Sequence, residues 1–99
     1  MAAVRIDSRE VFQEVLAEAR AATAALAASV PGWELCETIE AQLAFMAEET
    51  AGGAVPARED QLSTNLGPLA VKNLEESHPA YATLLKELDY AFRRYGALP

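Results

Sequence analysis

The sequence predicts an all-α protein, built as a compact single-domain bundle of about four helices. Apolar residues make up 52% of the 99 residues, and many of them are alanine, the residue that most favours helix. Apolar residues also recur three and four positions apart along most of the chain, which is the helical period. A chain of 99 residues has room for one core, so we expect a single domain over residues 1–99.

The first predicted helix follows Asp7 and runs to about Ser29. Asp7 is the expected cap and Glu10 closes a capping box, with Ile6 stapled to Val11. The apolar face comprises Val11, Phe12, Val15, Leu16, Ala19, Ala22, Leu26 and Val30. The far side carries what we call the alanine strip: Ala17, Ala21, Ala24, Ala25 and Ala28. The strip either receives a second helix, as in a homo-oligomer, or only favours helix formation.

The second predicted helix spans residues 33–50, after a turn at Pro31 and Gly32. Its core stripe comprises Leu35, Cys36, Ile39, Leu43, Met46, Ala47 and Thr50. This stripe leaves Phe45 on the opposite face, where a large aromatic side chain is unusual. Two interpretations remain open: Phe45 points outward into a binding surface, or it touches the first helix within the bundle.

The third predicted helix begins near Pro56 and crosses Gly67-Pro68 with its apolar period intact. Its core positions are Leu62, Leu66, Leu69, Ala70 and Leu74. The unbroken period favours one helix kinked at Gly67-Pro68, because Pro68 cannot donate a hydrogen bond to the carbonyl of Thr64. The alternative is a true break, with a new helix starting at Pro68.

The fourth predicted helix follows Ser77 or His78 as its cap, with Pro79 near its first position. The residues expected to point inward are Tyr81, Leu84, Leu85, Leu88, Ala91, Phe92 and Tyr95. Tyr90 points away from them, beside Lys86, Glu87 and Arg94. Gly96 is expected to stop the helix.

The charge limits the classes of partner. Fifteen acidic and eight basic residues give a formal charge of −7, which disfavours nucleic acid and anionic membranes. A basic protein partner would complement this charge, although the charge could equally serve solubility alone. No stretch approaches the roughly 20 apolar residues that span a bilayer, and no export signal is recognised, so we expect a cytoplasmic protein.

The sequence offers no constellation for catalysis, and we expect no enzyme, no cofactor and no metal site. His78 and Cys36 are the single histidine and cysteine, and they fall in different predicted contexts, a capping turn and an apolar stripe. Glu34, Glu37 and Glu40 lie on one helix, where such spacing usually forms a solvated face rather than a metal site. Function should therefore reside in a surface.

Two stretches resemble a family of small helical bacterial immunity proteins that neutralise type VI secretion effectors. They are VPGWELCETIEAQLAFM (residues 30–46) and NLGPLAVKNLEESHPAYATLLKELDYAFR (residues 65–93). The shared elements, in order, are Pro31-Gly32 before an aromatic residue and Glu34, then Glu40, Gln42-Leu43 and Phe45, then Leu66-Gly67, residues 69–72, Glu76 and Pro79. They cover about half of the chain. Pro68 departs from the family pattern.

The resemblance implies a stoichiometric inhibitor without turnover. It would bind a cognate toxin domain that hydrolyses NAD⁺ and NADP⁺, and would block its active site in the cytoplasm of producer and sister cells. The residues favour a binding patch around Phe45, because interface hot spots are rich in aromatic and arginine residues. The patch comprises Glu34, Glu37, Thr38, Ala41, Phe45 and Glu48, and a second candidate set comprises Lys86, Tyr90 and Arg94. The alternative function is a helical adaptor or a homo-oligomerisation module.

Overall fold

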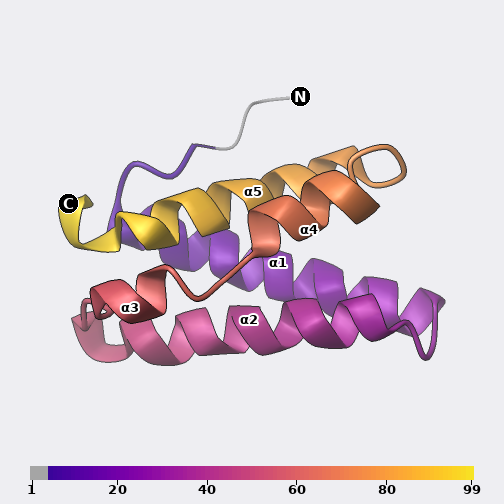
Figure 1. Cartoon of the computed structure of the whole chain (residues 1–99), viewed down its shortest axis with the longest axis horizontal. Helices are drawn as coiled ribbons and strands as arrows, with labels where there is room; N and C mark the ends of the chain where they lie inside the picture. The colour runs from indigo at the N-terminus through magenta and orange to yellow at the C-terminus, as the bar shows by residue number, and fades with distance from the viewer. Residues whose placement is uncertain (1–4) are drawn as a thin grey trace.

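The computed structural model describes residues 5–99 and contains helices but no strand over that range (Figure 1). Four longer helices are α1 (Arg9–Ser29), α2 (Glu34–Thr50), α4 (Leu66–Asn73) and α5 (Pro79–Arg93). A single turn, α3 (Arg58–Gln61), lies between α2 and α4, and 3₁₀ turns occupy Ala51–Gly53 and Tyr95–Ala97. The predicted all-α fold class is confirmed.

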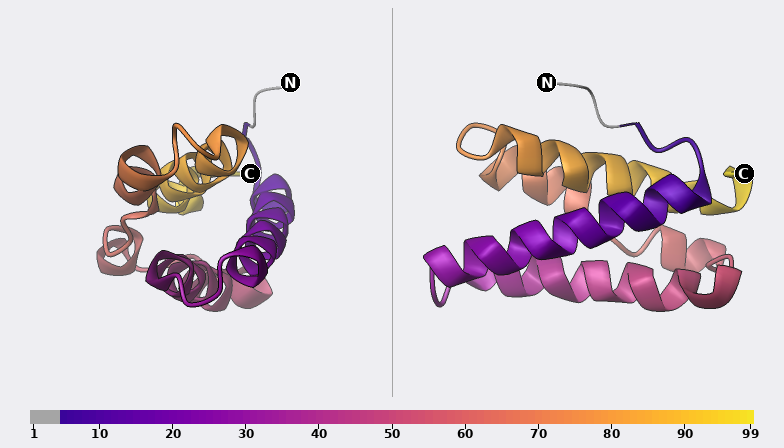
Figure 2. Two further views of the ribbon diagram at one scale, coloured as in Figure 1. Left: turned by 90° about the vertical axis from the view of Figure 1, so that its right-hand side faces the viewer. Right: turned by 180° about the vertical axis from the view of Figure 1, so that it is seen from behind.

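The helices surround one core. α1 packs against α2 and α5, and α4 packs mainly against α5. Viewed from the end, α1 and α2 form one side of the bundle and α4 and α5 the other (Figure 2). The radius of gyration is 12.8 Å, close to the ~13 Å expected for a compact chain of 100 residues.

α1 begins at Arg9, one residue later than a cap at Asp7 would place it. Ser8, rather than Asp7, is the N-cap, and its Oγ accepts a hydrogen bond of 3.1 Å from the Val11 N–H. A serine oxygen serves this role as well as a carboxylate does, because either can satisfy an N–H that the helix leaves unpaired. Asp7 is exposed, so the predicted capping box is wrong.

Aromatic rings from three helices meet at the centre of the bundle. The Phe12 ring of α1 lies 6.4 Å from the Phe92 ring of α5 and 5.0 Å from the Tyr95 ring. Phe45 of α2 meets Phe92 edge to face at 6.1 Å, an arrangement that aromatic pairs favour. These contacts join α1, α2 and α5 into one core.

The predicted core faces of the first, second and fourth helices agree with most of the buried positions. The buried residues that were predicted are Phe12, Val15, Leu16, Ala19, Cys36, Ile39, Leu43, Met46, Thr50, Tyr81, Leu84, Leu85, Leu88, Ala91, Phe92 and Tyr95. Val30 is an exception, with 44% of its surface exposed, because it lies past the end of α1 in the turn. Thr23, Ala82 and Asp89 are buried although the apolar pattern did not include them.

The third predicted helix is wrong as a single kinked element. The chain leaves helical geometry after Gln61 and starts α4 at Leu66, and no kink is evident at Gly67-Pro68. The alternative prediction, a true break with a new helix starting at Pro68, is closer to the structure, although α4 starts two residues before Pro68. Leu62 lies in the gap and is 50% exposed, so it is not a core residue, whereas Leu66, Ala70 and Leu74 are buried.

Pro68 is compatible with its position because it lies in the first turn of α4. The N–H groups of a first turn have no partner within the helix, so a proline there loses no hydrogen bond. The carbonyl of Thr64, which an N–H at position 68 would otherwise approach, accepts a hydrogen bond from Arg93 Nη2 at 3.1 Å.

α5 starts as predicted with Pro79 at its first turn and His78 as the cap residue. His78 makes no capping hydrogen bond with its side chain. Its Nδ1 lies 2.8 Å from Ser77 Oγ instead. The helix ends at Arg93, and Gly96 follows within the 3₁₀ turn.

Candidate functional site

Phe45, for which an outward position and a packed position were both open, is half-buried in the structure. Its side chain packs against the core, where its ring meets that of Phe92 of α5. Phe45 therefore has a structural contact whatever else it binds. Its exposed edge remains on the α2 surface.

The other five residues of the patch are exposed, as their positions opposite the apolar stripe predict. Glu34, Glu37, Thr38, Ala41 and Glu48 all lie on the solvent side of α2. Neither Glu34, Glu37 nor Glu48 has an ion-pair partner within residues 5–99. We call these five residues with Phe45 the acidic face, because three exposed carboxylates lie on it.

The second candidate set is internally engaged. The Arg94 guanidinium lies 4.6 Å from the centre of the Tyr90 ring, within the range of a cation–π interaction, and Arg94 Nη2 donates to the Ile6 carbonyl at 3.0 Å. Lys86 Nζ is held 2.9 Å from Glu75 Oε2. Tyr90 itself is 61% exposed. The two cations are thus partly committed to contacts within the chain.

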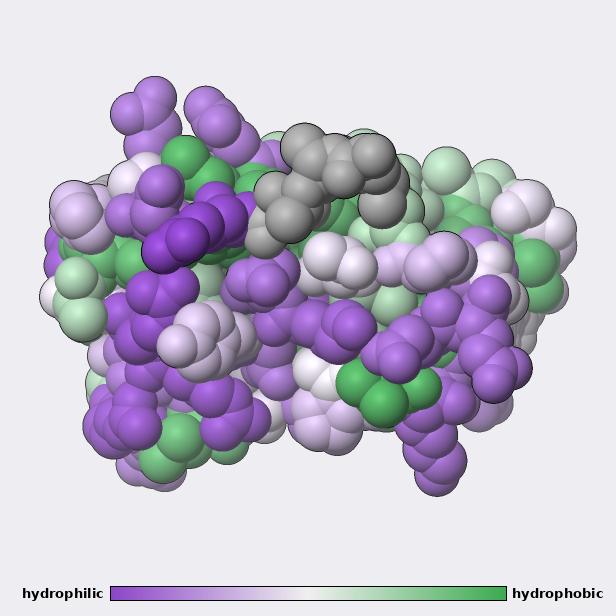
Figure 3. All heavy atoms as spheres, turned by 90° about the horizontal axis from the view of Figure 1, so that it is seen from above, coloured by the Kyte–Doolittle hydropathy of each residue, from purple (hydrophilic) through white to green (hydrophobic). Residues whose placement is uncertain are grey.

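The face over α4 and α5 is mainly hydrophilic. Hydrophobic residues lie on it as separate patches between hydrophilic ones (Figure 3). Val71 of α4 and Tyr90 of α5 are large and more than half exposed. Scattered apolar side chains of this kind are normal on a protein surface and need no partner to explain them.

The titratable groups show no converging set. Within residues 5–99, no three histidine, cysteine, aspartate or glutamate side chains gather as metal ligands. Burial raises the pKa of the Cys36 thiol, which disfavours the reactive thiolate. Glu49 has a raised pKa because its carboxyl group hydrogen-bonds Asp60, with smaller contributions from burial and from the charges of Asp60 and Glu48.

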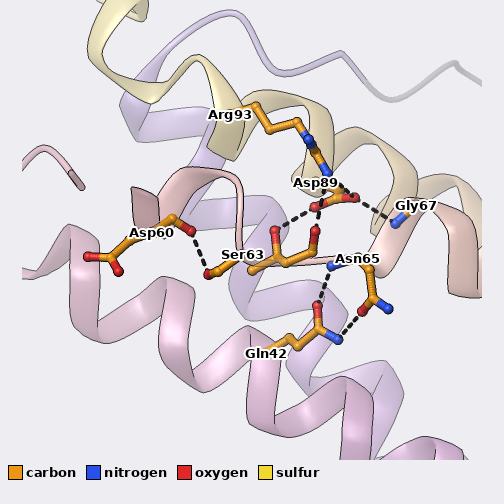
Figure 4. A network of polar contacts seen from close by, with 8 residues as sticks. Gln42, Asp60, Ser63, Asn65, Gly67, Asp89 and Arg93 are labelled. Carbon is orange, nitrogen blue, oxygen red and sulfur yellow. Dashed lines mark hydrogen bonds and ion pairs between the residues drawn. The ribbon is translucent and has the colours of Figure 1, made fainter. Parts of the chain in front are cut away.

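A buried carboxylate that the sequence analysis did not single out organises the start of α4. Asp89 of α5 accepts hydrogen bonds from the Thr64 hydroxyl at 2.7 Å and from the Gly67 N–H at 2.9 Å (Figure 4). Arg93 Nη2 lies 3.9 Å from Asp89 Oδ2. The carboxylate therefore caps α4 from a different helix, at the end where the helix dipole favours negative charge.

α2 holds the same end of α4 from the other side. Gln42 Oε1 accepts from the Asn65 N–H at 2.8 Å, and Gln42 Nε2 donates to Asn65 Oδ1 (Figure 4). Gln42 lies one residue from Ala41, so this pair fixes α2 against α4 beside the acidic face. No signal in the sequence pointed to these contacts, because only the structure shows that a helix starts at Leu66 with no side-chain cap of its own and takes acceptors from elsewhere.

No helix within residues 5–99 combines the length and apolar character needed to cross a membrane.

The comparisons with known proteins place this chain in a family. Searches of curated proteins and of solved structures gave no match. The model of the Tsi6 family matches residues 7–94, which includes α1 through α5. The chain therefore belongs to the Tsi6 family, a family of type VI secretion immunity proteins.

Proposed function

We propose that this chain is a cytoplasmic immunity protein that binds the cognate toxin domain of a type VI effector and covers its active site. The family match over residues 7–94 is the observation that carries the proposal. The toxin domain is an NAD(P)⁺ glycohydrolase, as the resemblance of residues 30–46 and 65–93 implies. The protein acts by binding alone, without turnover or cofactor, and protects producer and sister cells.

The charge of the chain supports this pairing. A cleft that holds the phosphates of NAD⁺ carries positive potential, and a surface with a formal charge of −7 is attracted to it. The extents of 35 × 28 × 21 Å accommodate an interface of roughly 800 Å² per partner, the size of a standard stable complex.

We place the main toxin contact on the acidic face. Glu34, Glu37 and Glu48 supply exposed carboxylates without ion-pair partners in residues 5–99, and the Phe45 edge supplies an apolar centre. The second set, Lys86, Tyr90 and Arg94, is the lesser candidate because Glu75 and the Ile6 carbonyl already engage its cations.

Co-expression tests the function. The toxin domain of the effector encoded beside this gene should stop growth and deplete cellular NAD⁺, and this chain should restore both. A catalytically inactive toxin domain should co-purify with the chain at a 1:1 ratio. Neither rescue nor co-purification would end the immunity proposal. Rescue without any prior loss of NAD⁺ would retain immunity and reject the glycohydrolase target.

A second candidate function is homo-oligomerisation through the alanine strip. All five residues of the strip are exposed, and Ala24 among them also lines a hollow beside α2. Two copies would bring together chains of charge −7, which opposes the association. Light scattering decides: a dimer that Ala21→Glu or Ala25→Glu dissociates would favour this candidate, and a monomer at all concentrations would remove it.

A further inference from the structure

A groove runs between the carboxyl-terminal half of α1 and the amino-terminal half of α2. Its volume is about 460 Å³, within the ~300–1,000 Å³ range of ligand pockets. Thr23, Ala24 and Ala27 of α1 and Trp33 and Cys36 of α2 line it. Ala24 and Ala27 are exposed, so the groove opens to solvent. It exists because alanine side chains on α1 are too small to fill the space beside α2.

The floor of the groove offers no polar group in need of a partner. Thr23 Oγ1 already donates to the Ala19 carbonyl at 2.7 Å and lies 2.6 Å from the Tyr81 hydroxyl. Cys36 is 3% exposed, and burial raises the pKa of its thiol. An apolar group fits this floor, because a polar group would lose its water without gaining a hydrogen bond.

The rim of the groove is negatively charged. Arg20 Nη2 lies 2.7 Å from Glu40 Oε1, which neutralises one carboxylate. Glu37 also lines the groove and has no ion-pair partner within residues 5–99. Such a rim opposes nucleotides and other phosphates and complements a cationic side chain.

The groove continues in two directions over the surface. Val30, Gly32 and Trp33 also line a neighbouring hollow of about 520 Å³ that reaches His78, at the end of the bundle where α1 turns into α2 (Figure 2, left). Glu37 belongs to both the groove and the acidic face. One partner can therefore cover the acidic face and reach the groove.

We propose that this groove receives a segment of the toxin domain, with an apolar side chain on the floor and a lysine or arginine beside Glu37. The inference rests on the proposed function and adds a second contact region to it. A second copy of this chain is the less suitable occupant, because its charge of −7 opposes the acidic rim. The groove thus selects a basic segment with an apolar anchor.

Two arginine substitutions with the same charge change test the groove. Ala27→Arg places a cation inside it, and Ala28→Arg, one residue further along α1, lies outside the lining residues. Affinity for the catalytically inactive toxin domain is measured by titration calorimetry. We expect Ala27→Arg to weaken binding by about tenfold or more, as loss of a hot-spot contact does. We expect Ala28→Arg to stay within about twofold of the wild type.

A pair of leucine substitutions separates filling from charge and guards against misfolding. Ala24→Leu fills the groove without adding charge, and Ala28→Leu is its control. We expect only Ala24→Leu to weaken binding while circular dichroism shows native helicity for both. Ala41→Arg changes the acidic face but none of the residues that line the groove, so its effect on toxin affinity reports on the acidic face alone.

Each outcome has one consequence. If the wild type binds and the groove variants bind equally well, the groove proposal is overturned and the immunity function stands. If the wild type itself neither binds nor rescues, the immunity function has failed. A wild-type dimer that Ala27→Arg dissociates would overturn the proposal in favour of a second copy as occupant.

Discussion

Asp89 and Gly67 are joined by a hydrogen bond of 2.9 Å from the Gly67 N–H to the carboxylate. The Asp89 side chain is almost fully buried, and a Cβ at position 67 would lie 3.1 Å from Asp89 Oδ2. Glycine at position 67 thus permits the close approach of α5 to the first turn of α4. Proline at position 68 follows at no cost in that turn.

Removing the Asp89 carboxylate should destabilise the bundle. Asp89→Ala leaves the buried Thr64 hydroxyl and the partly buried Gly67 N–H without this acceptor, so we expect the free energy of unfolding to fall by about 2 kcal/mol or more. Asp89→Asn should cost less, because its amide oxygen can still accept one of the two bonds. Urea denaturation measures both, and a loss below about 0.5 kcal/mol for Asp89→Ala would contradict the capping role.

A methyl group at position 67 should also destabilise the protein. Gly67→Ala crowds Asp89 Oδ2, and we expect a cost of about 1–3 kcal/mol, the usual range for overpacking. Thermal unfolding measures it. The double variant Gly67→Ala with Asp89→Ala is the control: if crowding is the cause, the glycine substitution should cost little in that background. Equal costs in both backgrounds would show that the carboxylate is not responsible.

Phe45 should prove partly structural. Phe45→Asp places a charge beside Phe92, and we expect it to lower the free energy of unfolding by about 2–3 kcal/mol. Phe45→Leu, which retains an apolar group, should lose about half as much. The matched control is Tyr90→Leu at an exposed ring, expected to cost at most about 1 kcal/mol through loss of the cation–π contact with Arg94. Unchanged stability in Phe45→Asp would show that the contact with Phe92 contributes nothing.

Charge on the acidic face should govern toxin affinity. We expect simultaneous reversal of Glu34, Glu37 and Glu48 to lysine to weaken binding at least about tenfold, chiefly through slower association. The control reverses Glu10, Glu14 and Glu18, which are exposed on α1 and change the net charge equally. Stopped-flow or biosensor kinetics at two salt concentrations measure both. Equal loss in the two triple variants would attribute binding to net charge and not to this face.

The pair of Glu49 and Asp60 should make stability depend on pH. The folded-state pKa of Glu49 is raised above its ordinary 4.5, first by its hydrogen bond to Asp60. The folded protein therefore holds its proton to a higher pH than the unfolded chain does. The stabilising contribution is fully present below about pH 4.5 and is lost as the pH rises through the folded-state pKa.

Glu49→Gln tests this dependence, because glutamine keeps the size of the side chain and does not titrate. Denaturation midpoints across mildly acidic pH should fall less steeply with rising pH in Glu49→Gln than in the wild type. Glu14→Gln, on the exposed face of α1, is the control and should follow the wild type. Parallel profiles for Glu49→Gln and the wild type would refute the assignment.

Much of the helical arrangement was predictable because α1, α2 and α5 are long and periodic. Phe12, Ile39, Leu43 and Leu85 were placed in the core from spacing alone, and all are buried. The region from Pro56 to Leu74 was not predictable in the same way, since a preserved apolar period does not distinguish a continuous helix from two short ones. Leu62 fits the period but lies in the gap and is exposed.

Part of the candidate surface was also predictable from the sequence, and part was not. The exposure of Glu34, Glu37 and Glu48 followed from the position of the apolar stripe on α2. The half-burial of Phe45 did not, because its partner Phe92 lies 47 positions further along the chain. The groove was not predictable from the sequence either, since Ala24 and Ala27 form one of its walls only where α2 lies beside them.

The sequence by itself determined the helical fold class, the main core positions, the charge and the family resemblance, because each depends on local periodicity, composition or residue order. Only the tertiary structure decided that Asp89 caps α4, that Gly67-Pro68 begins a helix rather than kinks one, and that a groove opens between α1 and α2. These features depend on contacts between helices far apart in the chain, and such contacts exist only after the helices pack.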